Sequence, residues 1–297
     1  MNTKVISAVG HVALRVRDVE AAVEHATSTM GLRLSGVQGA RHYLTEGEPH
    51  HSLQYVQADH DAVDHVGLEA SSHAALDEIR SRLADRGIPL LRDEPINDCF
   101  RDGLAFVVPG GFVIEVYIGM PMDGPAFSPV GVRPSRFGHV NFGIAEPAPL
   151  IEVLIEVLDF RVSDAFRGGA FLRCNEEHHG VGALVGPGVL QHHAWEVQSI
   201  ADLGRLGDLL DGRGESLLAG PVRHGMGRNI AAYIQGPANM MIEYYCDMQK
   251  IRDDENYVPG TWDENGHKWF TRWAPQLPDP ETRKLGMVPA PLPDRVA

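Results

Sequence analysis

One pattern of histidine and glutamate occurs twice in this chain of 297 residues. In each half, two strand-like hexapeptides that begin with histidine precede a third that ends with glutamate. The residues of the two sets are His11, His65 and Glu115, then His139, His192 and Glu243. The intervals are 54 and 50 residues in the first set and 53 and 51 in the second, so both span 104 residues. This internal duplication predicts a fold built from repeated units.

Each half divides again into two similar segments. Every segment opens with an alternating strand pattern, continues as a helix and ends in strand-like runs separated by turns. In the first segment, Asp18 is placed to cap a helix over VEAAVEHATSTM, and Gly31 ends that helix. We therefore predict an α+β fold of two tandem modules. Each module is a pair of β-α-β-β-β units forming a curled mixed sheet around a metal cavity.

A Pro/Gly-rich stretch, MPMDGPAFSPVGVRPS, separates the two halves and reads as a linker. The predicted boundaries are residues 1–127 for the N-terminal module, 128–135 for the linker and 136–247 for a C-terminal, metal-binding catalytic module. Residues 248–297 form a tail rich in aromatic, charged and proline residues. We expect this tail to pack on the surface or over the site.

The composition excludes several classes of function. A formal net charge of −14 argues against binding to nucleic acid or to an anionic membrane surface, since both need a basic face. We see no apolar run near the length of a membrane span and no signal peptide. The three cysteines are too few for a disulfide framework and favour a reducing compartment, so we predict a cytoplasmic enzyme.

Strand alternation decides which side chains meet, because successive residues point to opposite faces. His139 and Asn141 share one face of HVNFGI. In HHAWEV, spacing alone favours His193, whereas the apolar pattern favours His192. We adopt His192, because a register slip of one residue would turn every side chain of the strand over. Two neutral imidazoles and a carboxylate then occupy one face of an octahedral ion, as in non-haem Fe(II) oxygenases.

Two further segments carry a family resemblance. HGMGRNIAAYIQGPANMMIE contains His224, Tyr233, Pro237 and Glu243, and CNEEHH ends at His179. In these segments, and over about residues 8–247, the chain resembles the type I extradiol ring-cleaving dioxygenases of the vicinal oxygen chelate superfamily. The turn QGPAN departs from the more acidic turn of many relatives, which we interpret as hairpin variation.

The resemblance implies an activity and a set of roles. Fe(II), or less often Mn(II), would be held by His139, His192 and Glu243. His179 would serve as the acid–base group, and His224 with Tyr233 would hydrogen-bond the oxygens of a catecholic substrate that reacts with O2. The family also implies a homo-oligomer.

Two further residues are candidate substrate contacts. Asn141 either touches the substrate or hydrogen-bonds His139, and Arg223 either meets a substrate carboxylate or is solvated.

The N-terminal set leaves a question open. His11, His65 and Glu115 could hold a second metal ion, and His51 corresponds to His179. However, EPINDCFRDG contains no counterpart of His224. Ala105, or Phe106 if a small gap is allowed, stands where Tyr233 would be expected, and neither has a hydroxyl. The resemblance implies a metal-free, non-catalytic N-terminal module.

Other functions remain possible within the same pattern. Glyoxalases and 4-hydroxyphenylpyruvate dioxygenases also use histidine and glutamate ligands on such modules. A non-catalytic protein that sequesters small aromatic compounds is a different class of alternative. The sequence does not separate iron from manganese and does not identify the ring that is cleaved.

Overall fold

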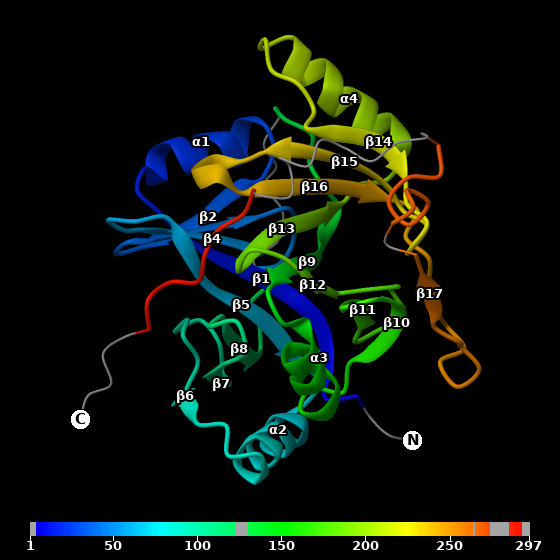
Figure 1. Cartoon of the computed structure of the whole chain (residues 1–297). Helices are drawn as coiled ribbons and strands as arrows, with labels where there is room; N and C mark the ends of the chain where they lie inside the picture. The colour runs from blue at the N-terminus through cyan, green and yellow to red at the C-terminus, as the bar shows by residue number, and fades with distance from the viewer. Residues whose placement is uncertain (1–3, 123–129, 264, 274–284, 293–297) are drawn as a thin grey trace.

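The computed structural model describes residues 4–122, 130–263, 265–273 and 285–292. Two mixed sheets dominate it, and they approach each other where β1 (Ile6–Val16) lies beside β9 (Arg136–Ile144) (Figure 1). The eight-stranded sheet has the order β2-β3-β4-β1-β5-β8-β7-β6. The nine-stranded sheet has the order β14-β15-β16-β13-β9-β12-β11-β10-β17.

Each sheet consists of two β-α-β-β-β units, as the repeat predicts. The strands of the first sheet are β1, β2 (Arg33–Gln38), β3 (Arg41–Thr45), β4 (Leu53–Gln57), β5 (Ala62–Ala70), β6 (Leu90–Arg92), β7 (Asp102–Val107) and β8 (Val113–Ile118). Those of the second are β9, β10 (Arg161–Phe166), β11 (Gly169–Arg173), β12 (Val181–Val185), β13 (Val189–Glu196), β14 (Ala219–Arg223), β15 (Ile230–Gln235), β16 (Met241–Cys246) and β17 (Gly260–Trp262). In every unit the last strand returns parallel to the first, and the two units of a sheet join antiparallel through β1–β5 and β9–β13.

One helix follows the first strand of each unit. The helices are α1 (Val19–Ser28), α2 (His73–Asp85), α3 (Pro147–Glu156) and α4 (Ile200–Asp211). Asp18 caps α1 by accepting a hydrogen bond from the amide of Ala21, and Gly31 follows the helix with φ of 65°. Each helix buries an apolar stripe against its own sheet. The opposite face of the central strands is therefore left to polar side chains.

The two sheets share one hydrophobic core. A single cluster of buried side chains runs from Val5 to Met287 and includes residues of both halves. Polar contacts cross the same boundary: Arg82 of α2 contacts Asp159 at 2.7 Å, and Arg213 donates to the hydroxyl of Thr29 at 2.7 Å. The two halves are thus packed as one body.

The structure adds strands that the sequence patterns did not predict. β2, β6 and β14 are short and partly exposed, so they lack an alternating apolar signal. β17, in the predicted tail, pairs in parallel with β10. The first two residues of the predicted linker, and parts of the tail, lie outside the described residues. Over the described part of the chain, no helix combines the length and apolar character needed to cross a membrane.

Candidate metal centre and its cavity

Three neighbouring strands bring His139, His192 and Glu243 together. In the register of β9, β13 and β16, His139 faces Ala194 and Ala194 faces Glu243, while His192 lies two residues before Ala194 on the same face. Nε2 of His139 lies 3.4 Å from Oε2 of Glu243, and Nε2 of His192 lies 3.2 Å from the same oxygen. All three side chains are buried. The small side chain of Ala194 leaves the space in which they converge.

His193 points to the other side of the sheet. It is buried in the core, where the indole N–H of Trp195 donates to its Nδ1 at 2.7 Å. Burial, followed by the charge of His192, lowers the pKa of His193 to about 3. The structure thus places His192, and not His193, beside Glu243.

Residue spacing and strand pattern disagree because three residues separate β12 from β13, whereas four separate β4 from β5. A β-bulge in β13 then positions the ligand. The register of β13 against β9 shifts between Leu190 and His192, so Gln191 is the extra residue. Its Oε1 accepts from Nδ1 of His192 at 3.2 Å and from Nδ2 of Asn141 at 2.9 Å. Bulges commonly aim a side chain at a site in this way. Here the bulge fixes the tautomer of His192 and leaves a lone pair on Nε2.

The three donors fit a divalent metal ion. Although Nε2 of His192 lies near Glu243, it has no hydrogen-bond partner of suitable geometry among the described residues. Asn229 donates to Oε1 of Glu243 at 3.0 Å, which leaves Oε2 facing the histidines. Burial lowers the pKa of His139 and keeps its imidazole neutral. Burial alone would raise the pKa of Glu243, but the adjacent imidazoles hold it well below its usual range. Neutral imidazoles and an ionised carboxylate are the states that metal binding requires.

A cavity of about 550 Å³ opens onto these residues. Its volume is in the range of pockets for small organic ligands. Much of the wall is apolar, including Phe171, Leu184 and Met226. Trp269 and Phe270, from the predicted tail, also line it. The tail therefore contributes to the cavity wall.

His224 and Tyr233 form a hydrogen-bonded pair in this wall. Nδ1 of His224 lies 2.5 Å from the carbonyl oxygen of Phe270, and its Nε2 lies 2.8 Å from the hydroxyl of Tyr233. Burial lowers the pKa of His224 and raises that of Tyr233 well above its usual range. We therefore assign a neutral imidazole that donates from Nδ1 to Phe270 and accepts the phenol proton at Nε2.

His179 packs against His139, one of the three candidate metal ligands. A chain of hydrogen-bond contacts connects it to Gly260 in the tail. The amide of Gly260 donates to Asp164 at 2.9 Å, and Asp164 lies 3.1 Å from Nε2 of His178. Nδ1 of His178 lies 3.1 Å from Nδ1 of His179, whose ring centroid is 4.3 Å from that of His139. If His178 donates to Asp164, His179 must donate through Nδ1, so its Nε2 keeps a lone pair. Burial lowers the pKa of His179 well below its usual value.

The two weaker candidates are placed differently. Asn141 lines the cavity and bonds Gln191 rather than His139. Arg223 is absent from the described cavity wall. Its guanidinium contacts Asp247 at 3.2 Å and the carbonyl of Arg228 at 2.5 Å.

Sequence reasoning did not identify Gln191, Asn229 or Asp164. These residues support the site through a bulge, a loop and a neighbouring strand, and no hydrophobic periodicity marks their roles. The one available signal was the position of Gln191 directly before a candidate ligand.

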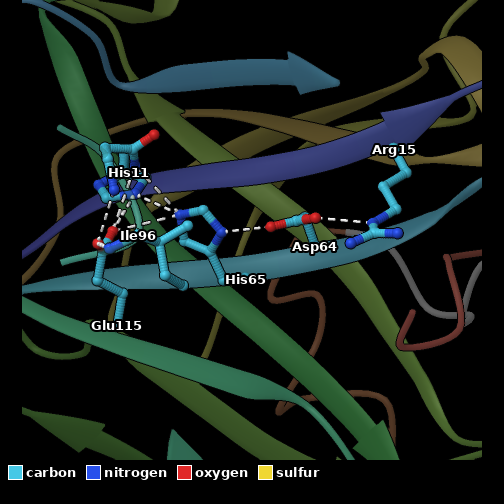
Figure 2. A network of polar contacts seen from close by, with 7 residues as sticks. His11, Arg15, Asp64, His65, Ile96 and Glu115 are labelled. Carbon is cyan, nitrogen blue, oxygen red and sulfur yellow. Dashed lines mark hydrogen bonds and ion pairs between the residues drawn. The ribbon is translucent and has the colours of Figure 1, made fainter. Parts of the chain in front are cut away.

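The N-terminal set also converges. His11, His65 and Glu115 lie around one point (Figure 2). Ala105 pairs with Glu115 as Tyr233 pairs with Glu243. Ala105 is thus the counterpart of Tyr233 without an intervening gap. Among the described residues, the N-terminal set has no hydroxyl group at this position.

The fold and the buried histidine–glutamate sets are similar to those expected of two-module vicinal oxygen chelate proteins. A model of the Glyoxalase/Bleomycin resistance protein/Dioxygenase superfamily matches residues 8–116. The manganese-dependent 2,3-dihydroxybiphenyl 1,2-dioxygenase of Geobacillus genomosp. 3 is 23% identical over 290 residues, covering 89% of this chain and 92% of the relative.

Solved structures share this fold over nearly the whole chain. Homoprotocatechuate 2,3-dioxygenase from Arthrobacter globiformis superposes with a TM-score of 0.86 at 20% identity, covering 98% of this chain and 95% of that one. The Mn(II)-bound glyoxalase from Novosphingobium aromaticivorans gives 0.83 at 23% identity, covering 97% and 95%. The comparisons confirm the family resemblance and the fold predicted from the sequence.

Proposed function

We propose that this protein is an extradiol dioxygenase that opens a catecholic ring beside its two hydroxyls, with Fe(II) held by His139, His192 and Glu243. The observation that carries the proposal is one buried cavity that contains this donor set together with His179 and the His224–Tyr233 pair. The named activity of the dihydroxybiphenyl relative supports the same reaction class. That relative is manganese-dependent, so Mn(II) is the alternative ion for the same ligands.

A bound divalent ion would acidify a catechol hydroxyl and provide adjacent positions for the diol and for O2. The protein residues must then manage protons and exclude water. Because Tyr233 donates its only hydroxyl proton to His224, its oxygen can accept a hydrogen bond from a substrate hydroxyl next to the ion. His179 is neutral, and its free Nε2 makes it the candidate base for a catechol proton and the later proton donor.

The cavity wall indicates the general character of the substrate. Phe171, Leu184 and Met226 offer apolar contact to an aromatic ring, whereas Arg223 lies outside the wall. A substrate carboxylate bound by Arg223 is therefore not expected, whereas Arg167 does line the wall. The size of the ring system stays open. A cytoplasmic location and a homo-oligomeric state also stay predictions.

The test is oxygen uptake by anaerobically purified protein loaded with Fe(II) or with Mn(II). A panel of monocyclic and bicyclic catechols is supplied while visible absorbance is followed. We expect stoichiometric uptake and a yellow ring-opened product with at least one ion. Tyr233→Phe should retain the ion and lose rate, and His192→Ala should lose the ion. Metal-loaded protein that consumes no oxygen with any catechol would contradict the proposal.

A second candidate is a non-oxidative metalloenzyme, supported by the fold shared with a Mn(II)-bound glyoxalase. It predicts a full complement of metal without oxygen uptake. A non-catalytic aromatic-binding protein predicts catechol binding by protein that contains no ion in the cavity site. The same uptake and metal measurements separate all three functions.

A further inference from the structure

We propose that His11, His65 and Glu115 bind a second divalent metal ion, in a closed, non-catalytic site of the N-terminal module. The three donor atoms form a compact triangle (Figure 2). Nε2 of His11 and Nε2 of His65 are 3.0 Å apart, and they lie 3.2 and 3.3 Å from Oε2 of Glu115. An octahedral ion with bonds of about 2.1 Å separates adjacent ligand atoms by about 3.0 Å. The three distances between the donor atoms are therefore close to those between three adjacent ligands of an octahedral ion.

Hydrogen bonds alone satisfy this triangle poorly. A proton lies between two atoms, whereas here three polar atoms face one common point. The competing interpretation is a buried ion pair, in which a protonated His65 lies between Asp64 and Glu115. Nδ1 of His11 has no hydrogen-bond partner among the described residues in either interpretation. A divalent ion would engage all three donors at once.

The surroundings hold His65 and Glu115 in the orientation that a metal ligand needs. Nδ1 of His65 lies 2.7 Å from Asp64, which in turn lies 2.7 Å from Nε of Arg15. A carboxylate behind a ligating histidine fixes its tautomer and raises its basicity. The amide of Ile96 donates to Oε1 of Glu115 at 2.5 Å, which leaves Oε2 to face the histidines.

The same local geometry occurs in the cavity site. His11 faces Gly67 and Gly67 faces Glu115, in the way that Ala194 stands between His139 and Glu243.

The supporting contacts are duplicated as well. Asp64 is the bulged residue of β5, as Gln191 is of β13, and each contacts the histidine that follows it. Asn97 donates to Glu115 as Asn229 donates to Glu243. The N-terminal module thus retains both the donors and their supports.

The absence of a Cβ at Gly67 brings the imidazole of His11 closer to the middle strand than a residue such as Ala194 would allow. A Cβ at this position would collide with the imidazole of His11, so only glycine allows that ring to lie across the middle strand. Gly67→Ala, which copies the residue found at Ala194, should therefore displace His11.

The site is closed to substrates. His11, His65 and Glu115 are each 0% exposed. Phe100 stacks on Tyr117 with ring centroids 3.9 Å apart, and it also lies 5.6 Å from the ring of His11. With Ala105 in place of a tyrosine, the described part of the module has no hydroxyl at the position that corresponds to Tyr233. We assign the ion a structural role and expect it to exchange slowly.

The experiment measures iron, manganese and zinc together, by elemental analysis of protein purified from medium that contains all three. The proposal predicts two equivalents per wild-type chain and one in the His139→Ala/His192→Ala double variant. It predicts one in Glu115→Gln and two in His73→Ala, a matched control that removes an exposed histidine paired with Asp102. If Glu115→Gln does not fold, the wild-type and double-variant counts still decide. A double variant without metal would overturn the proposal.

Chelation kinetics provide a second measurement. A chelator should remove one ion quickly through the cavity, while the other leaves only at the rate of unfolding. Loss of both ions at one fast rate would contradict a closed site. Gly67→Ala should lose the slowly exchanging ion and keep the fast one. A cavity site that fails to bind metal would instead count against the proposed dioxygenase function.

Discussion

His193 provides a quantitative test of the strand register, because the core holds this histidine in its neutral form. Its pKa is lowered from 6.5 to about 3, by burial first and by the charge of His192 second. In the unfolded chain the same side chain titrates near its ordinary value of about 6.5. Below that pH the unfolded state therefore binds a proton that the folded state does not. The stability that this residue contributes is complete above pH 6.5 and is lost progressively as the pH falls toward about 3.

The size of the effect follows from the two pKa values. Each pH unit in this window changes the free energy of unfolding by about 1.4 kcal/mol. Between pH 7.5 and 4.5, His193 alone should lower the stability of the wild-type protein by about 2.7 kcal/mol.

The perturbation is His193→Gln, which retains an oxygen that can accept the indole proton of Trp195 but cannot titrate. At neutral pH we expect this variant to be less stable than the wild type by about 1–2 kcal/mol. As the pH falls, the difference should shrink and then change sign.

The assay is urea unfolding of both proteins at several pH values, with a chelator in every sample so that metal release is the same for both. The other titrating groups are common to the two proteins and cancel in the difference. A stability difference that stays constant from pH 7.5 to 4.5 would refute the placement of a neutral His193 in the core.

Three further substitutions test the cavity site. His192→Ala should abolish binding of the cavity metal, whereas His193→Gln should keep it. Elemental analysis of the two variants shows which of these histidines is the metal ligand. Tyr233→Phe should retain the metal but lower kcat by roughly 10²-fold, since it removes one positioned hydroxyl; an unchanged rate would argue against its role. Gly138→Ala should lower stability by about 1–3 kcal/mol in thermal unfolding, because the added methyl collides with the hydroxyl of Tyr245. Gly207→Ala in α4, which has room for the methyl group, is the matched control and should be neutral or slightly stabilising.

Local periodicity accounts for what the sequence predicted correctly. Alternation in HVNFGI and HHAWEV settles which face each side chain occupies, so the convergence of His139 and His192 could be predicted without coordinates. The repeated order of strand and helix likewise predicted the four units. Strand alternation and the order of strands and helices depend on residues that are close in sequence. The tertiary contacts of the structure are consistent with both.

The remaining features depend on contacts between distant segments. Phe270 reaches His224 from the tail, and nothing in the tail sequence marks that contact. Asn229 supports Glu243 from a loop, where no periodicity applies. Adjacency in sequence also does not place a side chain: His224 lines the cavity, while the guanidinium of its neighbour Arg223 contacts Asp247.

The bulged residue beside each second histidine sets the charge that its imidazole experiences. In the N-terminal module this residue is Asp64, and in the cavity site it is Gln191, which is neutral. A carboxylate in this position makes a ligand imidazole a stronger electron donor and lowers the reduction potential of the ion that it binds. An amide leaves that potential higher, which would favour the ferrous state of an iron ion held at the cavity site. One residue choice in a duplicated bulge would thus tune the two proposed metal positions differently.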